Sequence, residues 1–142
     1  MQPHSYCFLS NYFQKKFGGK TRKLTLPGGT NCPNRDGTIG VGGCAFCGEN
    51  GGGNQTLAQI EDIQQHLEQS KAFLKKKYGA QYFFVYFQNF TSLYKPHPAI
   101  RKILPFIARQ SDMVGAALSA RPDFLDETLL LEIQHQLAHK EI

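Results

Sequence analysis

The sequence predicts an α/β fold in which short strands alternate with helices along 142 residues. Residues 23–26, 82–87 and 114–118 have the apolar character of strands, and each is followed by a loop and then by a segment of helical periodicity. Alternation of this kind is typical of a parallel sheet with right-handed crossover connections. A hydrophobic content of 41% belongs to a globular protein rather than to a disordered one. We therefore expect a folded α/β domain.

The strands are expected to differ in their surroundings. Residues 82–87 are apolar at every position, which is typical of a strand covered on both faces of a sheet. Residues 114–118 contain small side chains that allow close packing, and residues 23–26 end at the Pro27-Gly28-Gly29 turn signal. The strands at residues 82–87 and 114–118 are thus both predicted to be buried.

Three helices are predicted to follow the strands. The first spans about residues 56–78, where Thr56 opens a capping-box pattern. The second begins near Pro98, and Pro105 is expected to kink or shorten it. The third begins near Asp126, which is a good N-cap residue.

Three of the four cysteines lie in a glycine-rich loop after the first strand. Eleven residues separate Cys32 from a Cys-x-x-Cys pair, Cys44 and Cys47. Three thiolates in one loop indicate a metal site, and an iron–sulfur cluster with one open iron is one interpretation. A zinc site would need a fourth ligand such as Cys7 or His4. Free cysteines or a disulfide are the remaining alternatives, although a disulfide is disfavoured in a reducing compartment.

Polar and aromatic residues also follow the other two strands. Residues 88–94 come after the second strand, and residues 119–123 come after the third. Because parallel strands end at the same edge of a sheet, where barrel-like enzymes carry their chemistry, we expect these loops to meet the cysteine loop. Arg121 is expected either to bind a ligand at this edge or to have a structural role, in which it binds Asp123 or Asp126.

Composition limits the class of protein. No apolar run approaches the ~20 residues of a membrane span, and the N-terminus lacks the features of a secretion signal. A cytoplasmic protein without a membrane partner is therefore expected. The net charge of +5 permits an anionic partner. Five positive charges within residues 15–23 are either a solvated turn around Gly18 and Gly19 or a patch that contacts phosphate.

Several stretches resemble the radical S-adenosylmethionine (radical SAM) superfamily. They are residues 16–18 (Lys-Phe-Gly), the cysteine loop 32–47 with the aromatic Phe46 before its last cysteine, residues 86–94 (YFQNFTSLY) and residues 118–123 (LSARPD). Together they span most of residues 12–126 in the order of the family. Within the superfamily the chain looks most similar to the YhcC/YtqA-like group, relatives of the catalytic subunit of Elongator.

The resemblance implies a fold and a set of cofactors. The fold is the N-terminal half, about three βα units, of a partial (βα)6 radical SAM barrel, with residues 1–13 as a lead-in and residues 14–142 as a core domain truncated at its C-terminus. A [4Fe-4S] cluster is implied at Cys32, Cys44 and Cys47. Contacts to S-adenosylmethionine are implied for Phe46, Gln88, Ser119 and Arg121.

The resemblance also implies an enzyme that cleaves S-adenosylmethionine to methionine and a 5′-deoxyadenosyl radical. A reductant such as flavodoxin or ferredoxin would supply the electron, and tRNA, modified at wobble uridine, is the candidate substrate. The alternative is a non-catalytic zinc- or cluster-binding module.

Two structural expectations follow from length and position. At about thirty residues per βα unit the chain holds about half of the barrel, so its third strand is expected to present an exposed edge. Cys7 lies outside the loop and is expected to pack as a small apolar residue.

Overall fold

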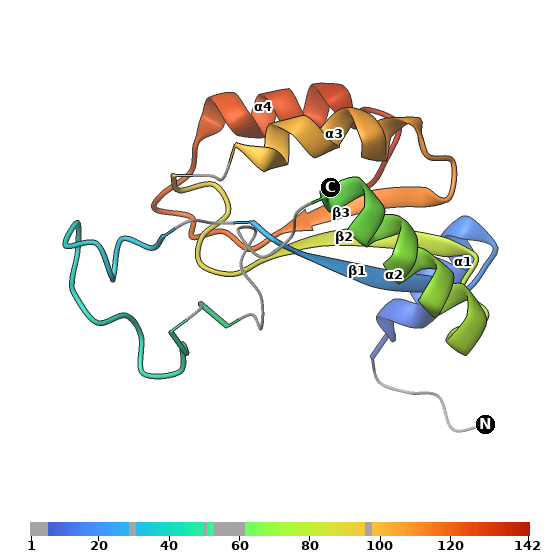
Figure 1. The fold of residues 1–142 in the computed structure, drawn as a ribbon, viewed down its shortest axis with the longest axis horizontal. Coiled ribbons are helices and arrows are strands. Elements are labelled where there is room, and N and C mark those ends of the chain that lie inside the picture. Colours follow the sequence, from blue (N-terminus) through green and yellow to red (C-terminus); the bar gives the residue numbers. More distant parts are fainter. Residues whose placement is uncertain (1–5, 29–30, 50, 53–61, 96–97) are drawn as a thin grey trace.

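The computed structural model describes residues 6–28, 31–49, 51–52, 62–95 and 98–142. Strands and helices alternate as predicted, and the sheet has the order β1-β2-β3 with both neighbouring pairs parallel. The elements, shown in Figure 1, are α1 (Leu9–Phe17), β1 (Thr21–Pro27), α2 (Ile63–Tyr78), β2 (Tyr82–Gln88), α3 (Ala99–Arg109), β3 (Met113–Leu118) and α4 (Glu127–Gln136).

The parallel register brings the carboxyl ends of the strands to one edge of the sheet. β1 and β2 pair from Thr21 with Tyr82 to Pro27 with Gln88, and β2 pairs with β3 after a register shift between Phe83 and Phe84. The loops that follow the three strands gather at this edge, and the cysteine loop extends beyond it (Figure 1). The described structure therefore has the three-stranded α/β core that was expected.

The two faces of the sheet are covered unequally. Phe83, Val85 and Phe87 of β2 are buried in the core, together with side chains of α2, α3 and α4. On the other face the alternate residues of β2 are only half-buried, and α1 covers part of that face through Phe13, whose ring stacks on Phe84 at 5.3 Å. The prediction that both faces of this strand are buried was wrong for the second face, because α1 reaches only one end of it.

The helix ends follow from local chemistry. The predicted start at Thr56 lies outside the described residues; where α2 is described, the side chain of Asp62 caps it by accepting from a backbone N–H three residues on, at 3.0 Å. Asp126 caps α4 in the same way at 2.9 Å, as predicted. α3 contains Pro105 and continues to Arg109. Within the described residues, no helix is long and apolar enough to cross a membrane.

The outer edge of β3 is not fully exposed, which corrects the expectation from length. Glu141 forms a parallel bridge with Gly115: its carbonyl accepts from Ala116 at 2.8 Å, and its N–H donates to Val114 at 3.0 Å. A side chain at Gly115 would prevent this approach, because a Cβ there would lie 2.5 Å from the carbonyl oxygen of Glu141. The side chain of Glu141 also forms an ion pair with Lys16 of α1. The terminal segment thus connects β3 with the helix on the half-buried face.

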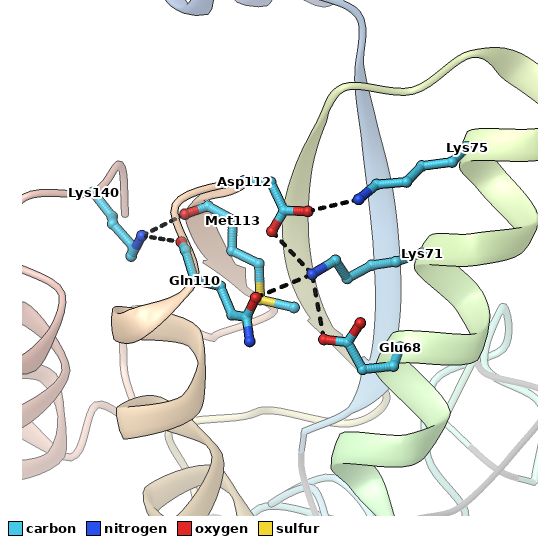
Figure 2. A network of polar contacts seen from close by, with 7 residues as sticks. All are labelled: Glu68, Lys71, Lys75, Gln110, Asp112, Met113 and Lys140. Atoms are coloured by element: carbon cyan, nitrogen blue, oxygen red, sulfur yellow. Dashed lines mark hydrogen bonds and ion pairs between the residues drawn. The ribbon is translucent and has the colours of Figure 1, made fainter.

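A buried lysine lies near the amino-terminal end of β3 (Figure 2). The ammonium group of Lys71 on α2 lies 2.9 Å from one carboxylate oxygen of Asp112, and only 5% of the side chain is exposed. It also donates to Gln110 at 3.2 Å and to Glu68 at 3.3 Å. The other oxygen of Asp112 accepts from Lys75 at 3.0 Å. We call these five residues the lysine network.

The charges of the lysine network compensate one another. Burial alone would raise the pKa of Asp112, but the hydrogen bonds and charges of Lys71 and Lys75 outweigh it, and the pKa lies below its usual value. Lys140 extends the contacts by donating to the carbonyls of Met113 at 2.5 Å and Gln110 at 2.9 Å. Buried charges are tolerated when they are paired and hydrogen-bonded. The network therefore connects α2, the α3–β3 turn and the C-terminal segment.

Candidate functional site

The eleven-residue spacer between Cys32 and Cys44 is folded by its own backbone. The carbonyl of Pro33 accepts from Ile39 at 2.8 Å and from Gly40 at 3.2 Å, and Asp36 forms an antiparallel bridge with Val41. Gly37, Gly42 and Gly43 have φ between 83° and 88°, a region that glycine adopts without steric cost. Because the N–H of Gly43 donates to the carbonyl of Asn34 at 2.9 Å, the two ends of the spacer lie side by side.

The three thiols of the loop are free and half-buried. The side-chain amide of Asn34 donates to the sulfur of Cys44 at 3.1 Å, and the hydroxyl of Thr91 donates to the sulfur of Cys32 at 3.9 Å. Donors of this kind stabilise a thiolate and orient it. Among the residues that the structure describes, however, no group of three or more His, Cys, Asp or Glu side chains is placed to hold a metal ion. The thiols therefore share a loop but are not yet gathered around one point.

Arg35 connects the spacer to the segment that contains the Cys-x-x-Cys pair. Its guanidinium donates to the carbonyls of Gly48 at 2.6 Å, Glu49 at 3.2 Å and Cys47 at 3.4 Å. The same group lies 5.6 Å from the ring centroid of Phe90 in the loop after β2. One side chain thus contacts the backbone from Cys47 to Glu49 and the next loop. The planar, five-donor guanidinium suits this set of acceptors, and lysine would not.

Asp36 connects the spacer to the loop after β2 by a second route. Its carboxylate accepts from Lys95 at 2.5 Å, from the hydroxyls of Tyr94 and Thr38 at 2.8 Å, and from the Thr38 N–H at 3.1 Å. The hydrogen bonds from Lys95, Thr38 and Tyr94 hold the pKa of this carboxyl far below its usual range. The same partner, Asp36, raises the pKa of Lys95. We call Asp36, Thr38, Tyr94 and Lys95 the Asp36 cluster.

The structure brings Gln88 and Ser119 to the same edge as the cysteine loop, as predicted. Gln88 ends β2, and its side-chain amide donates to the carbonyl of Gly52 at 2.6 Å, just beyond the cysteines. The carbonyl of Ser119 accepts from Ser92 at 2.6 Å, and its hydroxyl donates to Phe90 at 3.4 Å. These contacts confirm that the loops after the three strands meet. They do not test whether either residue contacts S-adenosylmethionine, which stays a prediction.

Arg121 has the structural role that was one of its two predicted roles. Two of its nitrogens donate to the two carboxylate oxygens of Asp123, at 3.0 and 2.6 Å, whereas Asp126 caps α4 instead. The hydrogen bonds that Arg121 donates to Asp123 are the main reason why the pKa of Arg121 is raised, and the charges of Cys32 and Cys44 add to this effect. Arg121 therefore lies within electrostatic reach of two of the three thiols while it is bound to its own loop.

One aromatic side chain, that of Phe46, and one thiol, that of Cys7, are exposed. The side chain of Phe46, between the paired cysteines, is 88% exposed. Cys7 is exposed as well, and its thiol donates to the neighbouring Phe8 carbonyl at 3.6 Å. The expectation that Cys7 packs as a small apolar residue was wrong, because it precedes α1, a helix with no buried residue.

The predicted basic stretch lies at the opposite end of β1 from the cysteine loop. Lys20 donates to the backbone carbonyl of Tyr78 at 3.0 Å, and the guanidinium of Arg22 lies 4.7 Å from the centroid of the Tyr78 ring. Lys77 of α2 lies 5.1 Å from this ring. The folded chain therefore brings the basic stretch next to Lys77 at the end of α2.

The loop after β2 has an unusual backbone conformation. Asn89 and Phe90 adopt positive φ (76° and 52°), which is uncommon for residues other than glycine and costs free energy. Phe90 and Tyr94 are the aromatic residues of this loop. In the structure they contact the cysteine loop through Arg35 and Asp36. Asp36 itself was missed, although the Asp-x-Thr pattern is a sequence signal for a local turn.

Curated relatives share most of this chain. It is similar to an uncharacterized protein, YtqA, of Bacillus subtilis (32% identity over 125 residues, covering 88% of this chain and 39% of the relative). It is also similar to the protein YhcC of Escherichia coli (34% over 119 residues; 82% and 36%) and to an uncharacterized protein, MJ0486, of Methanocaldococcus jannaschii (30% over 125 residues; 84% and 36%).

The comparisons describe a shared segment rather than an activity. This chain spans 36–39% of the length of these three relatives. No family model matches the chain, and no solved structure matches it. The names of these relatives state no reaction.

Proposed function

We propose that this chain is the cluster-binding part of a radical SAM enzyme and that Cys32, Cys44 and Cys47 are the ligands of a [4Fe-4S] cluster. The observation that carries the proposal is the position of three free thiols on one loop at the carboxyl edge of a parallel sheet. This is the edge at which α/β barrels carry their active sites. The radical SAM barrel and membership of the YhcC/YtqA-like group are part of the same proposal.

The chemistry of the loop fits such a cluster. The thiols are not cross-linked, and one of them already accepts a hydrogen bond from Asn34. Hydrogen bonds to cluster sulfurs and partial solvent exposure both influence reduction potential. Three cysteines leave one iron open, and a bound [4Fe-4S] cluster with S-adenosylmethionine would supply one electron for cleavage to methionine and a 5′-deoxyadenosyl radical.

The residues of this chain would bind and orient these groups. Gln88 and Ser119 lie at the ends of β2 and β3, where their polar atoms already bond to neighbouring loops. Arg121 adds a positive charge that the thiolates of Cys32 and Cys44 sense. Phe46 projects into solvent, where its ring is available to a ligand. We propose these four residues as the contacts to S-adenosylmethionine.

The experiment is metal analysis after anaerobic purification and reconstitution with iron and sulfide. Four irons and four sulfides per chain, with an electron paramagnetic resonance signal that changes when S-adenosylmethionine is added, are expected for a [4Fe-4S] cluster with an open iron. Bound zinc without sulfide would instead support the zinc-binding module. A cluster whose signal is indifferent to S-adenosylmethionine would support a cluster-binding module without turnover.

The proposal includes two partners. A cytoplasmic reductant such as flavodoxin or ferredoxin would supply the electron, and a tRNA is the proposed substrate. The basic cluster around Tyr78 supports an anionic partner, because Lys20, Arg22 and Lys77 converge there from two segments. The basic cluster lies at the other end of the sheet from the cysteines, so an RNA substrate would contact the protein at both ends of the sheet.

A further inference from the structure

The cysteine loop makes its contacts with the rest of the protein through a small number of side chains. From the spacer, Arg35 and Asp36 reach out in two directions: Arg35 toward residues 47–49 and Phe90, and Asp36 toward Tyr94 and Lys95. Both are adjacent in the chain and follow Cys32 within four residues. Of these two residues, Asp36 has the partners that lie farther away in sequence.

Two partners of Asp36, Tyr94 and Lys95, belong to a loop that is bound to the rest of the protein by contacts of its own. In the loop after β2, Ser92 is fully buried, and its N–H donates to Ser119 at 2.6 Å. The carbonyl of Leu93 accepts from Asp126 at 3.0 Å, which joins this loop to the beginning of α4. The ring of Tyr94 packs edge-on against Phe124 at 5.2 Å. The hydroxyl that reaches Asp36 is thus fixed by contacts that do not involve the cysteine loop.

Asp36 is coupled in turn to the cysteines. Its N–H and that of Arg35 donate to the carbonyl of Cys32, at 3.2 and 2.8 Å. The same turn leads back to Asn34, which accepts from Gly43 and donates to the sulfur of Cys44. A displacement of Asp36 would therefore move the first thiol through the Cys32 carbonyl and the second thiol through Asn34.

We infer that Asp36 is a positioning residue that holds the cysteine loop on the loop after β2 before any metal binds. The four hydrogen bonds to the Asp36 carboxylate come from groups of this chain itself. They leave the carboxylate little capacity to serve as a metal ligand. The inference deepens the proposed function, since a preformed loop lowers the cost of assembling the site.

The test uses metal-free, reduced protein and two variants. Tyr94→Phe removes one donor to Asp36 and keeps every charge, whereas Asp36→Asn removes the charge of the acceptor. The rate of alkylation by iodoacetamide is measured separately for each cysteine by mass spectrometry. The exposed Cys7, outside the loop, serves as an internal reference. Hydrogen exchange of the Ile39 and Gly43 amides reports the spacer without depending on the ionisation of the thiols.

Glu132→Gln is the matched control. It removes an ion pair with Arg101 at 2.8 Å between α4 and α3, away from the cysteine loop. We expect alkylation of Cys32 and Cys44 to become about three- to tenfold faster in both test variants, the order of effect of losing a charge-assisted hydrogen bond. Exchange in the spacer should accelerate by a similar factor. Rates for Cys7, and all rates in the control, should stay within about twofold.

The outcomes separate this inference from the proposed function. Unchanged alkylation and exchange in both variants would overturn the positioning role. Acceleration in Asp36→Asn alone would also overturn it, because removal of a nearby negative charge raises thiolate reactivity without any movement. If wild-type protein binds no iron, the proposed function fails, yet the metal-free rates still decide the role of Asp36. If iron binds, both variants should bind less of it than the control.

Discussion

The two ends of the sheet place polar groups in opposite ways. At the amino-terminal end of β3 the lysine network connects helices and turns, and Lys71 is buried among its acceptors. At the carboxyl end the Asp36 cluster and Arg35 connect loops, and the thiols beside them stay half-buried and free. In both places ionic groups hold two segments together. The thiols beside the Asp36 cluster remain accessible, so we expect the carboxyl end to serve chemistry and the lysine network to serve stability.

Replacing the loop cysteines is expected to have the largest effect at the carboxyl end. Cys32→Ala, Cys44→Ala and Cys47→Ala should each abolish cluster assembly, because no other thiol within the described residues shares their loop. Their folding should change little, since the lysine network at the opposite end is untouched. Iron and sulfide analysis, with circular dichroism as the check on folding, tests both statements.

Cys7→Ala is the control for these three variants. Cys7 is exposed and precedes α1, so its loss should leave the iron content unchanged. Loss of metal in the Cys7 variant, with zinc rather than iron in the wild type, would instead favour a four-ligand zinc site. The division between the two ends would then have to include the N-terminal segment in the metal site.

Lys71→Met should show the reverse pattern. It leaves Asp112 with Lys75 as its remaining cation and deprives Gln110 of its donor, at a position where the lysine side chain is 5% exposed. Removing one partner of a buried ion pair is strongly destabilising; because Asp112 is partly exposed and keeps Lys75, we expect a loss of about 1–3 kcal/mol in the free energy of unfolding. Urea titration measures this loss.

Lys75→Met provides the comparison for Lys71→Met. Half of the Lys75 side chain is exposed, so its pair with Asp112 should contribute less than about 1 kcal/mol. Iron binding should be unchanged in both variants. A drop in iron binding with Lys71→Met, at temperatures where the variant is folded, would show that the two ends are coupled.

The contrast between the ends also explains what the sequence could predict. The apolar run of β2 and the cap at Asp126 are encoded by neighbouring residues, so the strands and the starts of α3 and α4 were placed correctly, whereas the predicted start at Thr56 lies outside the described residues. The half-buried face of β2 was not, because its cover, α1, comes from a distant segment. The pairing of Glu141 with β3 likewise depends on a contact across the chain.

The candidate site could likewise be predicted where neighbouring residues determine it, and not where it depends on contacts between distant segments. Cysteine spacing located the loop, and the order of strands placed the loops of Gln88 and Ser119 beside it. The Asp36–Tyr94 contact joins residues that are 58 positions apart in the sequence, so no local sequence pattern predicts it. Lys71 similarly looks like one of several exposed helix lysines, and its burial becomes visible only when Asp112 is placed against α2.

Asp112, at the amino-terminal end of β3, is expected to make the free energy of unfolding depend on pH. The folded pKa of Asp112 is lowered, so its stabilising contribution is complete above the unfolded pKa of about 4 and is lost as the pH falls through the folded pKa. Asp112→Asn should therefore lower stability at pH 7 and flatten its decline below about pH 4. Urea titrations of both proteins from pH 7 to pH 3 measure this difference. Parallel curves would mean that Asp112 contributes no charge-dependent stability.

The smallest expected effect concerns the basic stretch of residues 15–23 at the same end, whose Lys20 and Arg22 contact Tyr78. Each lysine or arginine that neutralises an RNA phosphate adds roughly 0.7 to 0.9 to the slope of log affinity against log salt. Replacing Lys15, Lys16 and Lys20 with alanine should lower that slope by about two rather than three, because Lys16 is already paired with Glu141. Titration with bulk tRNA at several salt concentrations measures the slope, and Cys44→Ala, at the other end, should leave it unchanged. An equal slope in the triple variant would exclude this surface, and a slope lowered by Cys44→Ala would place RNA at the cysteine edge instead.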